Sequence, residues 1–142
     1  MPEDCQIILI GLSEKQVKEL PEGIIGITRT ENAKELAACY SMADVFVNAT
    51  LEDNFPTTNL EALSCGTPVI TFETGGSPES LDDTCGRVVK KGDVEALQQA
   101  ILAEREHPMR KEDCLTRAVQ YEKNDRFMEY AALYHRLWGQ GE

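Results

Sequence analysis

Basic residues are scarce in this chain of 142 residues, which has 14 Lys and Arg against 25 Asp and Glu and a net charge of −11. The acidic excess lies in residues 1–109, whereas residues 110–142 carry six residues of each sign. A protein that binds nucleic acid or an anionic membrane surface through phosphate groups needs a basic stripe. The composition therefore argues against nucleic acid as a partner and against attachment of this domain to an anionic membrane.

Paired cysteines are also missing, because the chain has an odd number and no CxxC spacing: Cys5, Cys39, Cys65, Cys85 and Cys114. This usage favours reduced thiols over a disulfide scaffold or a zinc site. The first residues are acidic, unlike a secretory signal, and no apolar run reaches the length of a membrane span. We therefore expect a cytoplasmic protein.

Short apolar runs alternate with helical patterns along the chain. The runs at 6–12, 24–30, 44–50 and 67–74 predict buried strands, and a shorter run at 86–93 predicts an edge strand. Helical spacing occurs at 14–20, 31–43, 57–66 and 93–106, with Ser13 and Asp93 as expected caps. The alternation predicts the α/β class, with a parallel sheet covered by helices on both faces.

The chain after Pro108 has only helical spacing. Its apolar residues repeat on one face of a predicted helix: Phe127, Tyr130, Ala131, Tyr134, Leu137 and Trp138. We expect this stripe to pack on the body of the protein, with a seam for a missing partner or domain as the alternative. The predicted organisation is a domain at 1–108 and a helical segment of the same domain at 109–142.

The stretch DNFPTTNLE, residues 53–61, joins a predicted strand end to a helix start. The N–H groups at a helix start lack partners and attract anions, so Thr57, Thr58 and Asn59 could bind a phosphate. The Glu61 carboxylate could accept hydrogen bonds from a ribose diol, and Asp53 could face the other end of the same ligand. Gly11 follows another strand and is expected at the same edge of the sheet.

Ordinary structural roles could also explain these residues. Acids near a helix start stabilise the helix dipole, and Asp53 and Asn54 are common turn residues. The loop matches neither the glycine-rich dinucleotide pattern nor the Walker pattern of ATP sites. The residues alone leave the structural and ligand-binding interpretations open.

A longer stretch, ADVFVNATLEDNFPTTNLEALSCGTPVITFETGGSPE, resembles the C-terminal, donor-binding domain of retaining glycosyltransferases of the glycosyl transferase group 1 family, which have the GT-B fold. The family motif has two glutamates separated by seven residues. Glu61 matches the second, and Asp53 holds the first position. The resemblance extends from about residue 6 to about residue 101, through the Cys-Gly-Thr-Pro-Val-Ile and Gly-Gly motifs.

This resemblance implies a Rossmann-like domain that binds a nucleotide-sugar donor. Glu61 would bind the donor ribose and Asp53, the catalytic candidate, would contact the transferred sugar, while backbone N–H groups of Asn54, Phe55, Thr57 and Thr58 serve the sugar and diphosphate. No metal or other cofactor is expected, because the helix dipole and basic side chains would stabilise the leaving diphosphate.

The resemblance also implies missing parts. A full enzyme has an N-terminal acceptor domain and the first strands of the donor domain, so we expect this chain to be an inactive part of a longer enzyme. The acceptor would be a saccharide or a lipid-linked saccharide, and the full-length enzyme could lie at the membrane periphery. Two alternatives are a receiver-like phosphoacceptor domain and a protein-interaction module that uses the stripe near Trp138.

Overall fold

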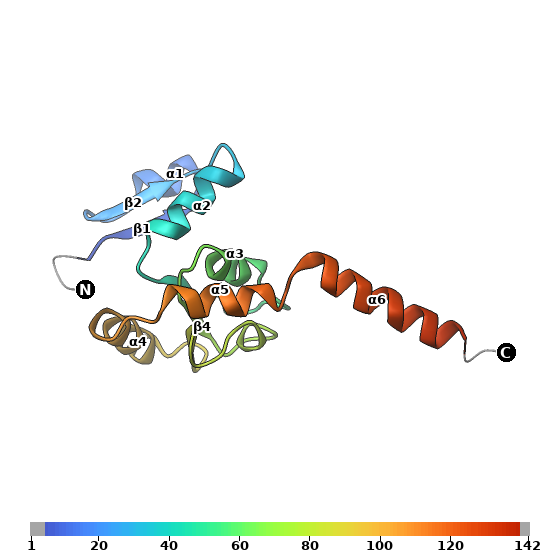
Figure 1. The fold of residues 1–142 in the computed structure, drawn as a ribbon. Coiled ribbons are helices and arrows are strands. Elements are labelled where there is room, and N and C mark those ends of the chain that lie inside the picture. The colour runs from blue at the N-terminus through green and yellow to red at the C-terminus, as the bar shows by residue number, and fades with distance from the viewer. Residues whose placement is uncertain (1–4, 140–142) are drawn as a thin grey trace. The chain divides into compact units, whose positions relative to one another are not determined.

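The computed structural model describes residues 5–139 and divides the chain into two units, Met1–Cys39 and Tyr40–Glu142, which are described separately. Figure 1 traces the chain through both units. Within the described residues, no helix is both long and apolar enough to cross a membrane.

The first unit contains two parallel strands and two helices. Strand β1 (Ile7–Ile10) pairs with β2 (Ile24–Ile27), with Ile7 opposite Ile24. Helix α1 (Glu14–Lys18) lies between them in sequence, and α2 (Ala33–Met42) follows and ends inside the second unit. Ser13 caps α1 as predicted, through a reciprocal pair of hydrogen bonds with Gln16.

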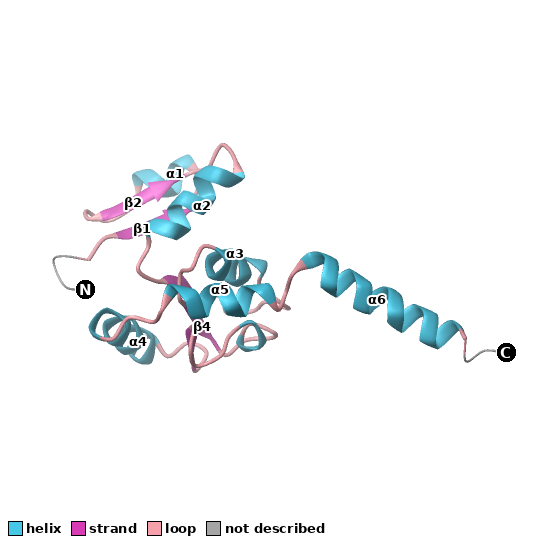
Figure 2. Ribbon diagram, viewed as in Figure 1, coloured by secondary structure: helices cyan, strands magenta, loops and turns pink. Residues whose placement is uncertain are grey.

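The second unit is built on three parallel strands in the order β3-β4-β5: β3 (Phe46–Asn48), β4 (Val69–Phe72) and β5 (Gly86–Val89). Figure 2 shows the helices among which they lie: α3 (Thr57–Ser64), the short 3₁₀ helix η1 (Pro78–Ser80), α4 (Val94–Glu106), α5 (Lys111–Val119) and α6 (Lys123–Trp138). The predicted α/β class with parallel strands is confirmed. Within the described residues the strands form two parallel ladders, β1-β2 in the first unit and β3-β4-β5 in the second.

The core of the second unit lies along β4, whose four residues are all buried, as expected for the central strand. Helix α3 covers it with Asn59, Ala62 and Leu63. The polar Asn59 therefore lies on the inner face of α3, beside two apolar residues. Leu63 is fully buried, whereas Ser64 is exposed and donates to the Leu60 carbonyl oxygen at 2.7 Å.

Two cysteine thiols belong to this core. Cys85 and Cys114 are fully buried, whereas Cys39 and Cys65 are partly exposed, and these four are free thiols. Burial raises the pKa of Cys85 to about 11 and the pKa of Cys114 to about 12, because the apolar surroundings disfavour the thiolate. This state agrees with the reduced thiols that the odd cysteine count predicts.

Helix α6 contradicts the prediction that its apolar stripe packs on the body. No side chain of this helix is buried, and Trp138 is 88% exposed. The aromatic side chains contact one another instead, as in the Tyr130–Tyr134 pair with ring centroids 5.4 Å apart. Figure 1 shows α6 continuing beyond α5 as a separate rod. Helical periodicity identifies an apolar face but not the surface that covers it. The apolar stripe of α6 is therefore exposed in this chain.

Candidate functional site

The segment between β3 and α3 carries most of the residues predicted to bind the donor. Asp53 and Phe55 are partly exposed, and Asn54 is exposed. Among the described residues, the Asp53 carboxylate has no recorded hydrogen bond or ion pair. A carboxylate without a protein partner is available to a ligand hydroxyl.

Two glycines after β4 hold this segment in place. The Gly76 N–H donates to the Asn54 carbonyl oxygen at 2.7 Å. Gly75 has a φ of +48°, and a Cβ atom there would lie 1.7 Å from the Asp53 carbonyl oxygen. A side chain at residue 75 would therefore collide with the loop backbone, so the close approach requires glycine.

Helix α3 begins at Thr57, as predicted, without a side-chain cap. Pro56 occupies the cap position and has no hydrogen bond to give, and no acidic residue lies in the first turn. Thr57 and Thr58 are exposed. The N–H groups of a helix start have no partner inside the helix, so these two threonines present an open helix start to an anion.

Asn59 differs from its expected place. Its N–H donates to the Pro56 carbonyl oxygen at 3.2 Å, so this group is not open to an anion. Its side chain is fully buried and donates to the hydroxyls of Ser77 and Ser80 at 3.0 Å each, while it accepts from Asn48 at 2.9 Å. Asn59 thus joins α3 to the end of β3 and to η1.

Glu61 is exposed on the second turn of α3, next to Tyr40. The Tyr40 hydroxyl donates to Glu61 Oε2 at 3.2 Å, and the Tyr40 ring packs edge-on against Phe46 at 5.3 Å between centroids. Burial, followed by the Glu61 charge, raises the pKa of Tyr40. Because Glu61 lies beyond the first turn, stabilisation of the helix start does not explain its position.

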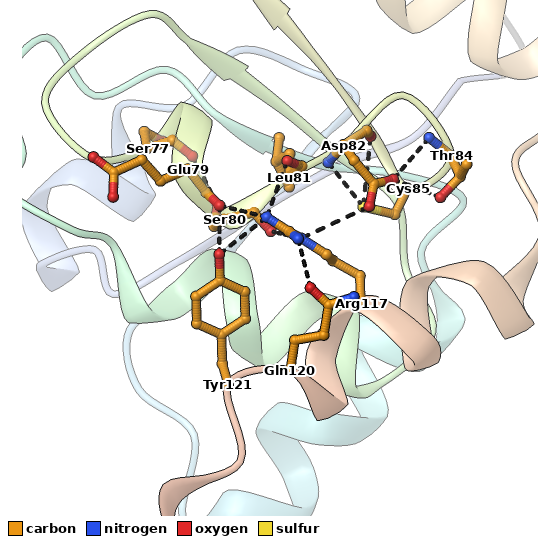
Figure 3. A network of polar contacts seen from close by, with 10 residues as sticks. All are labelled: Ser77, Glu79, Ser80, Leu81, Asp82, Thr84, Cys85, Arg117, Gln120 and Tyr121. Atoms are coloured by element: carbon orange, nitrogen blue, oxygen red, sulfur yellow. Dashed lines mark hydrogen bonds and ion pairs between the residues drawn. The ribbon is translucent and has the colours of Figure 1, made fainter. Parts of the chain in front are cut away.

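A second polar cluster, not predicted from the sequence, lies between η1 and α5 (Figure 3). Arg117 donates to three successive carbonyl oxygens: Glu79 at 2.6 Å, Ser80 at 3.2 Å and Leu81 at 3.3 Å. The Tyr121 hydroxyl also donates to the Glu79 carbonyl oxygen. These contacts join residues about forty positions apart, which no local pattern reveals.

Gly11 belongs to the first unit and is described only within it. Its φ is +91° and its N–H donates to the Ile27 carbonyl oxygen at 2.9 Å. Apart from its two neighbours in the chain, no described residue has an atom within 4 Å of a Cβ built there, so the turn is open within the part of the chain that the structure describes. Its role in donor binding stays a prediction.

No group of three His, Cys, Asp or Glu side chains suited to hold a metal ion occurs in the part of the chain that the structure describes. A hollow of about 500 Å³ lies between β5 and α4, where Arg87, Val89 and Ala103 line it. A smaller hollow of about 190 Å³ lies on α6 between Tyr130 and Leu137. None of the predicted donor-binding residues lines either hollow.

Curated relatives match the part of the chain that contains this site. The GDP-mannose-dependent alpha-(1-6)-phosphatidylinositol monomannoside mannosyltransferase of Mycolicibacterium smegmatis is 40% identical over 82 residues, which cover 52% of this chain and 22% of that protein. The MMP alpha-(1->4)-mannosyltransferase of Mycolicibacterium hassiacum is 35% identical over 92 residues, 61% of this chain and 22% of that protein. The chain thus spans a minor part of each relative.

Solved structures of lower identity share the fold. Sucrose-phosphate synthase from Thermosynechococcus elongatus gives a TM-score of 0.81 at 24% identity and covers 96% of this chain and 39% of that chain. HepE of Anabaena, solved in complex with UDP, gives 0.70 at 19% identity and covers 92% of this chain and 42% of that chain. The model of the family described as glycosyl transferases group 1 matches residues 1–104. Since this match covers most of the 142 residues, the chain belongs to the glycosyl transferases group 1 family.

Proposed function

We propose that this chain is the donor-binding half of a retaining glycosyltransferase. The complete enzyme would transfer a sugar from a nucleoside diphosphate sugar to a saccharide or lipid-linked acceptor. The observation that carries the proposal is the exposed Glu61 carboxylate on the helix whose open start follows the Asp53–Phe55 segment. In a chain of this family, that arrangement offers an acceptor for a ribose diol and N–H donors for a diphosphate.

The proposed roles follow from the chemistry of each group. Glu61 holds the ribose, the N–H groups of Thr57 and Thr58 hold the diphosphate, and Asp53 contacts hydroxyls of the transferred sugar. Backbone groups of Asn54 and Phe55 complete the sugar site, and Gly11 of the first unit stays a predicted donor-binding residue. Leaving-group charge is stabilised by the helix start rather than by a metal.

The remaining parts of the enzyme lie outside this chain. An acceptor domain is the proposed partner, and the exposed apolar stripe of α6 supports contact with a further protein surface, because large exposed apolar patches mark interaction sites. We propose a cytoplasmic location, with the full-length enzyme at the membrane periphery. The family match gives no support to a receiver-like domain.

Titration of the 142-residue chain with UDP-sugars and GDP-sugars tests donor binding. We expect amide chemical shifts to change at Asp53–Glu61 and at Gly11, with one nucleotide preferred over the other. ATP at the same concentration is the control, because it carries a triphosphate and no sugar beyond its phosphates, unlike the proposed donor. A chain whose amides respond to none of these nucleotide sugars would remove the basis for the proposal.

Substitution of the two acids in the full-length enzyme tests the assigned roles. Glu61→Ala should weaken donor affinity by about tenfold to a hundredfold, the range for a charged hydrogen-bond partner. Asp53→Ala should weaken donor affinity less than Glu61→Ala does. Donor affinity is measured by isothermal titration calorimetry and turnover by sugar transfer. Wild-type kinetics in both variants would overturn the site assignment.

A further inference from the structure

Tyr121 joins the end of α5 to the predicted donor loop. Its ring lies against Phe55, with centroids 5.8 Å apart and the planes tilted by 43°. Its hydroxyl donates to the Glu79 carbonyl oxygen and accepts from Arg117 Nη2 at 3.0 Å. The ring therefore contacts the loop while the hydroxyl is fixed by two neighbours.

Arg117 fixes Tyr121 from the α5 side. Its side chain is only 18% exposed, and its guanidinium lies 5.2 Å from the centre of the Tyr121 ring. A planar guanidinium that donates in several directions has one preferred orientation, and a lysine could not reproduce it. Figure 3 shows the guanidinium between the carbonyl groups of η1 and the Tyr121 hydroxyl.

Phe55 is held on a second side by the glycine turn. A Cβ atom at Gly76 would lie 3.0 Å from Phe55 Cδ2, so the backbone of residue 76 already approaches the ring closely. The Gly76 N–H also donates to the Asn54 carbonyl oxygen, so the backbone next to Phe55 is held at residue 54. The loop is thus confined between the glycine turn and Tyr121.

From these contacts we infer that Tyr121 is a positioning residue for the donor loop, acting through Phe55, and that Arg117 sets its orientation. This inference rests on the proposed donor-binding function. The ring of Tyr121 limits where Phe55 can lie, and Phe55 carries with it the backbone N–H groups of residues 54 and 55. Loss of the ring would therefore lower affinity for the donor without removing any group that touches it.

The test compares Tyr121→Leu, which removes the aromatic ring, with Tyr121→Phe, which keeps it. The matched control is Tyr134→Leu, which replaces an exposed tyrosine of α6. Each 142-residue variant is titrated with UDP and with GDP while amide shifts are recorded. Tyr121→Leu should lower the affinity for whichever of the two nucleotides wild type binds by about threefold to tenfold, the range expected for one lost aromatic pair. The control should stay within about twofold of wild type, and Tyr121→Phe, which keeps the ring contact with Phe55 but loses both hydroxyl contacts, should weaken binding less than Tyr121→Leu does.

Ligand-free spectra separate this inference from the proposed function. Tyr121→Leu should move the amide shifts of residues 54, 55 and 76, whereas Tyr134→Leu should leave them in place. Unchanged loop shifts, or unchanged nucleotide affinity in a wild type that binds, would overturn the positioning role. If wild type binds neither UDP nor GDP, the proposed function loses its support, and the ligand-free shifts still decide whether Tyr121 positions the loop.

Discussion

Asn59 places a polar side chain where the core of the second unit is fully buried, and all of its hydrogen-bonding groups have partners. The neighbouring hydroxyls continue the chain of contacts, since Thr71 and Ser77 share a hydrogen bond of 2.6 Å. Buried polar groups of this kind stabilise a structure only while every member is satisfied. The network therefore fixes α3 relative to β3 and η1, and with them the start of the donor loop.

We expect Asn59→Leu to lower the free energy of unfolding by about 2–4 kcal/mol, because it removes the three buried hydrogen bonds that Asn59 makes with the Asn48, Ser77 and Ser80 side chains. Urea denaturation of the 142-residue chain measures the change. Ser64→Ala on the exposed side of the same helix is the control and should change the free energy by less than about 0.5 kcal/mol. An Asn59→Leu variant as stable as the control would show that the network is not stabilising.

The hydroxyl of a single residue, Tyr40, orients the Glu61 carboxylate. Tyr40→Phe keeps the ring contact with Phe46 and removes only the hydroxyl that donates to Glu61. We expect donor affinity to fall by about twofold to tenfold, the value of one typical hydrogen bond, because Tyr40 acts on the donor only through Glu61. Thermal unfolding should change little because the buried ring stays. In Glu61→Ala the same substitution should have no further effect on affinity, and an equal loss in both backgrounds would refute the coupling.

Caps and glycines set the ends of the elements. Asp93 accepts from the Ala96 N–H at 2.9 Å and caps α4, and Gly66 follows the end of α3 with a φ of +77°. Both were predictable, because the residues that make each cap lie within a few positions of one another. The Gly75-Gly76 turn after β4 could be predicted from the sequence, but its contact with the loop before α3 could not, because that contact joins segments about twenty residues apart.

Gly75 and Gly92 form a matched pair for testing that contact. Both have positive φ, of +48° and +78°, but only Gly75 lies against another segment, while Gly92 has open space around it. Gly92→Ala should cost about 1 kcal/mol from backbone strain alone. Gly75→Ala should cost more than twice as much and should move the amide shifts of Asp53 and Asn54. If urea denaturation shows the same loss of unfolding free energy in both variants, the loop before α3 moves away from residue 75 at no energetic cost.

Sequence reasoning succeeded for local elements and failed where distant segments meet. The predicted strands, the start of α3 and the caps at Ser13 and Asp93 depend on spacing along the chain. The Arg117 cluster and the buried side of Asn59 depend on which segments pack together, and a helical period does not carry that information. The same limit explains α6, whose apolar face was identified correctly and whose burial was not.

At the scale of the whole molecule, the two buried thiols make stability depend on pH. Their pKa values are raised from 9.0 to about 11 for Cys85 and to about 12 for Cys114, so the folded protein keeps both protonated where the unfolded chain ionises. The contribution is fully present below pH 9 and is lost as pH rises toward the folded-state values.

We therefore expect the free energy of unfolding to fall between about pH 9 and about pH 11, beyond any change below pH 9. Urea denaturation at several pH values measures the slope. Cys85→Ala and Cys114→Ala should each flatten it, while Cys65→Ala, at a partly exposed position, should leave it unchanged. An identical slope in all four proteins would assign the loss of stability to other groups.

The burial of Cys85 and Cys114 also provides a natural reporter of transient opening. An alkylating reagent needs both access and a thiolate, so in the folded chain it should modify the partly exposed Cys39 and Cys65 before Cys85 and Cys114, which it reaches only when the core around β5 and α5 separates. The rate at which they gain mass would then time that separation under native conditions, with no dye and no engineered residue. A nucleotide that binds the second unit should slow the alkylation of Cys85 and Cys114, because binding stabilises the closed state relative to the opened one.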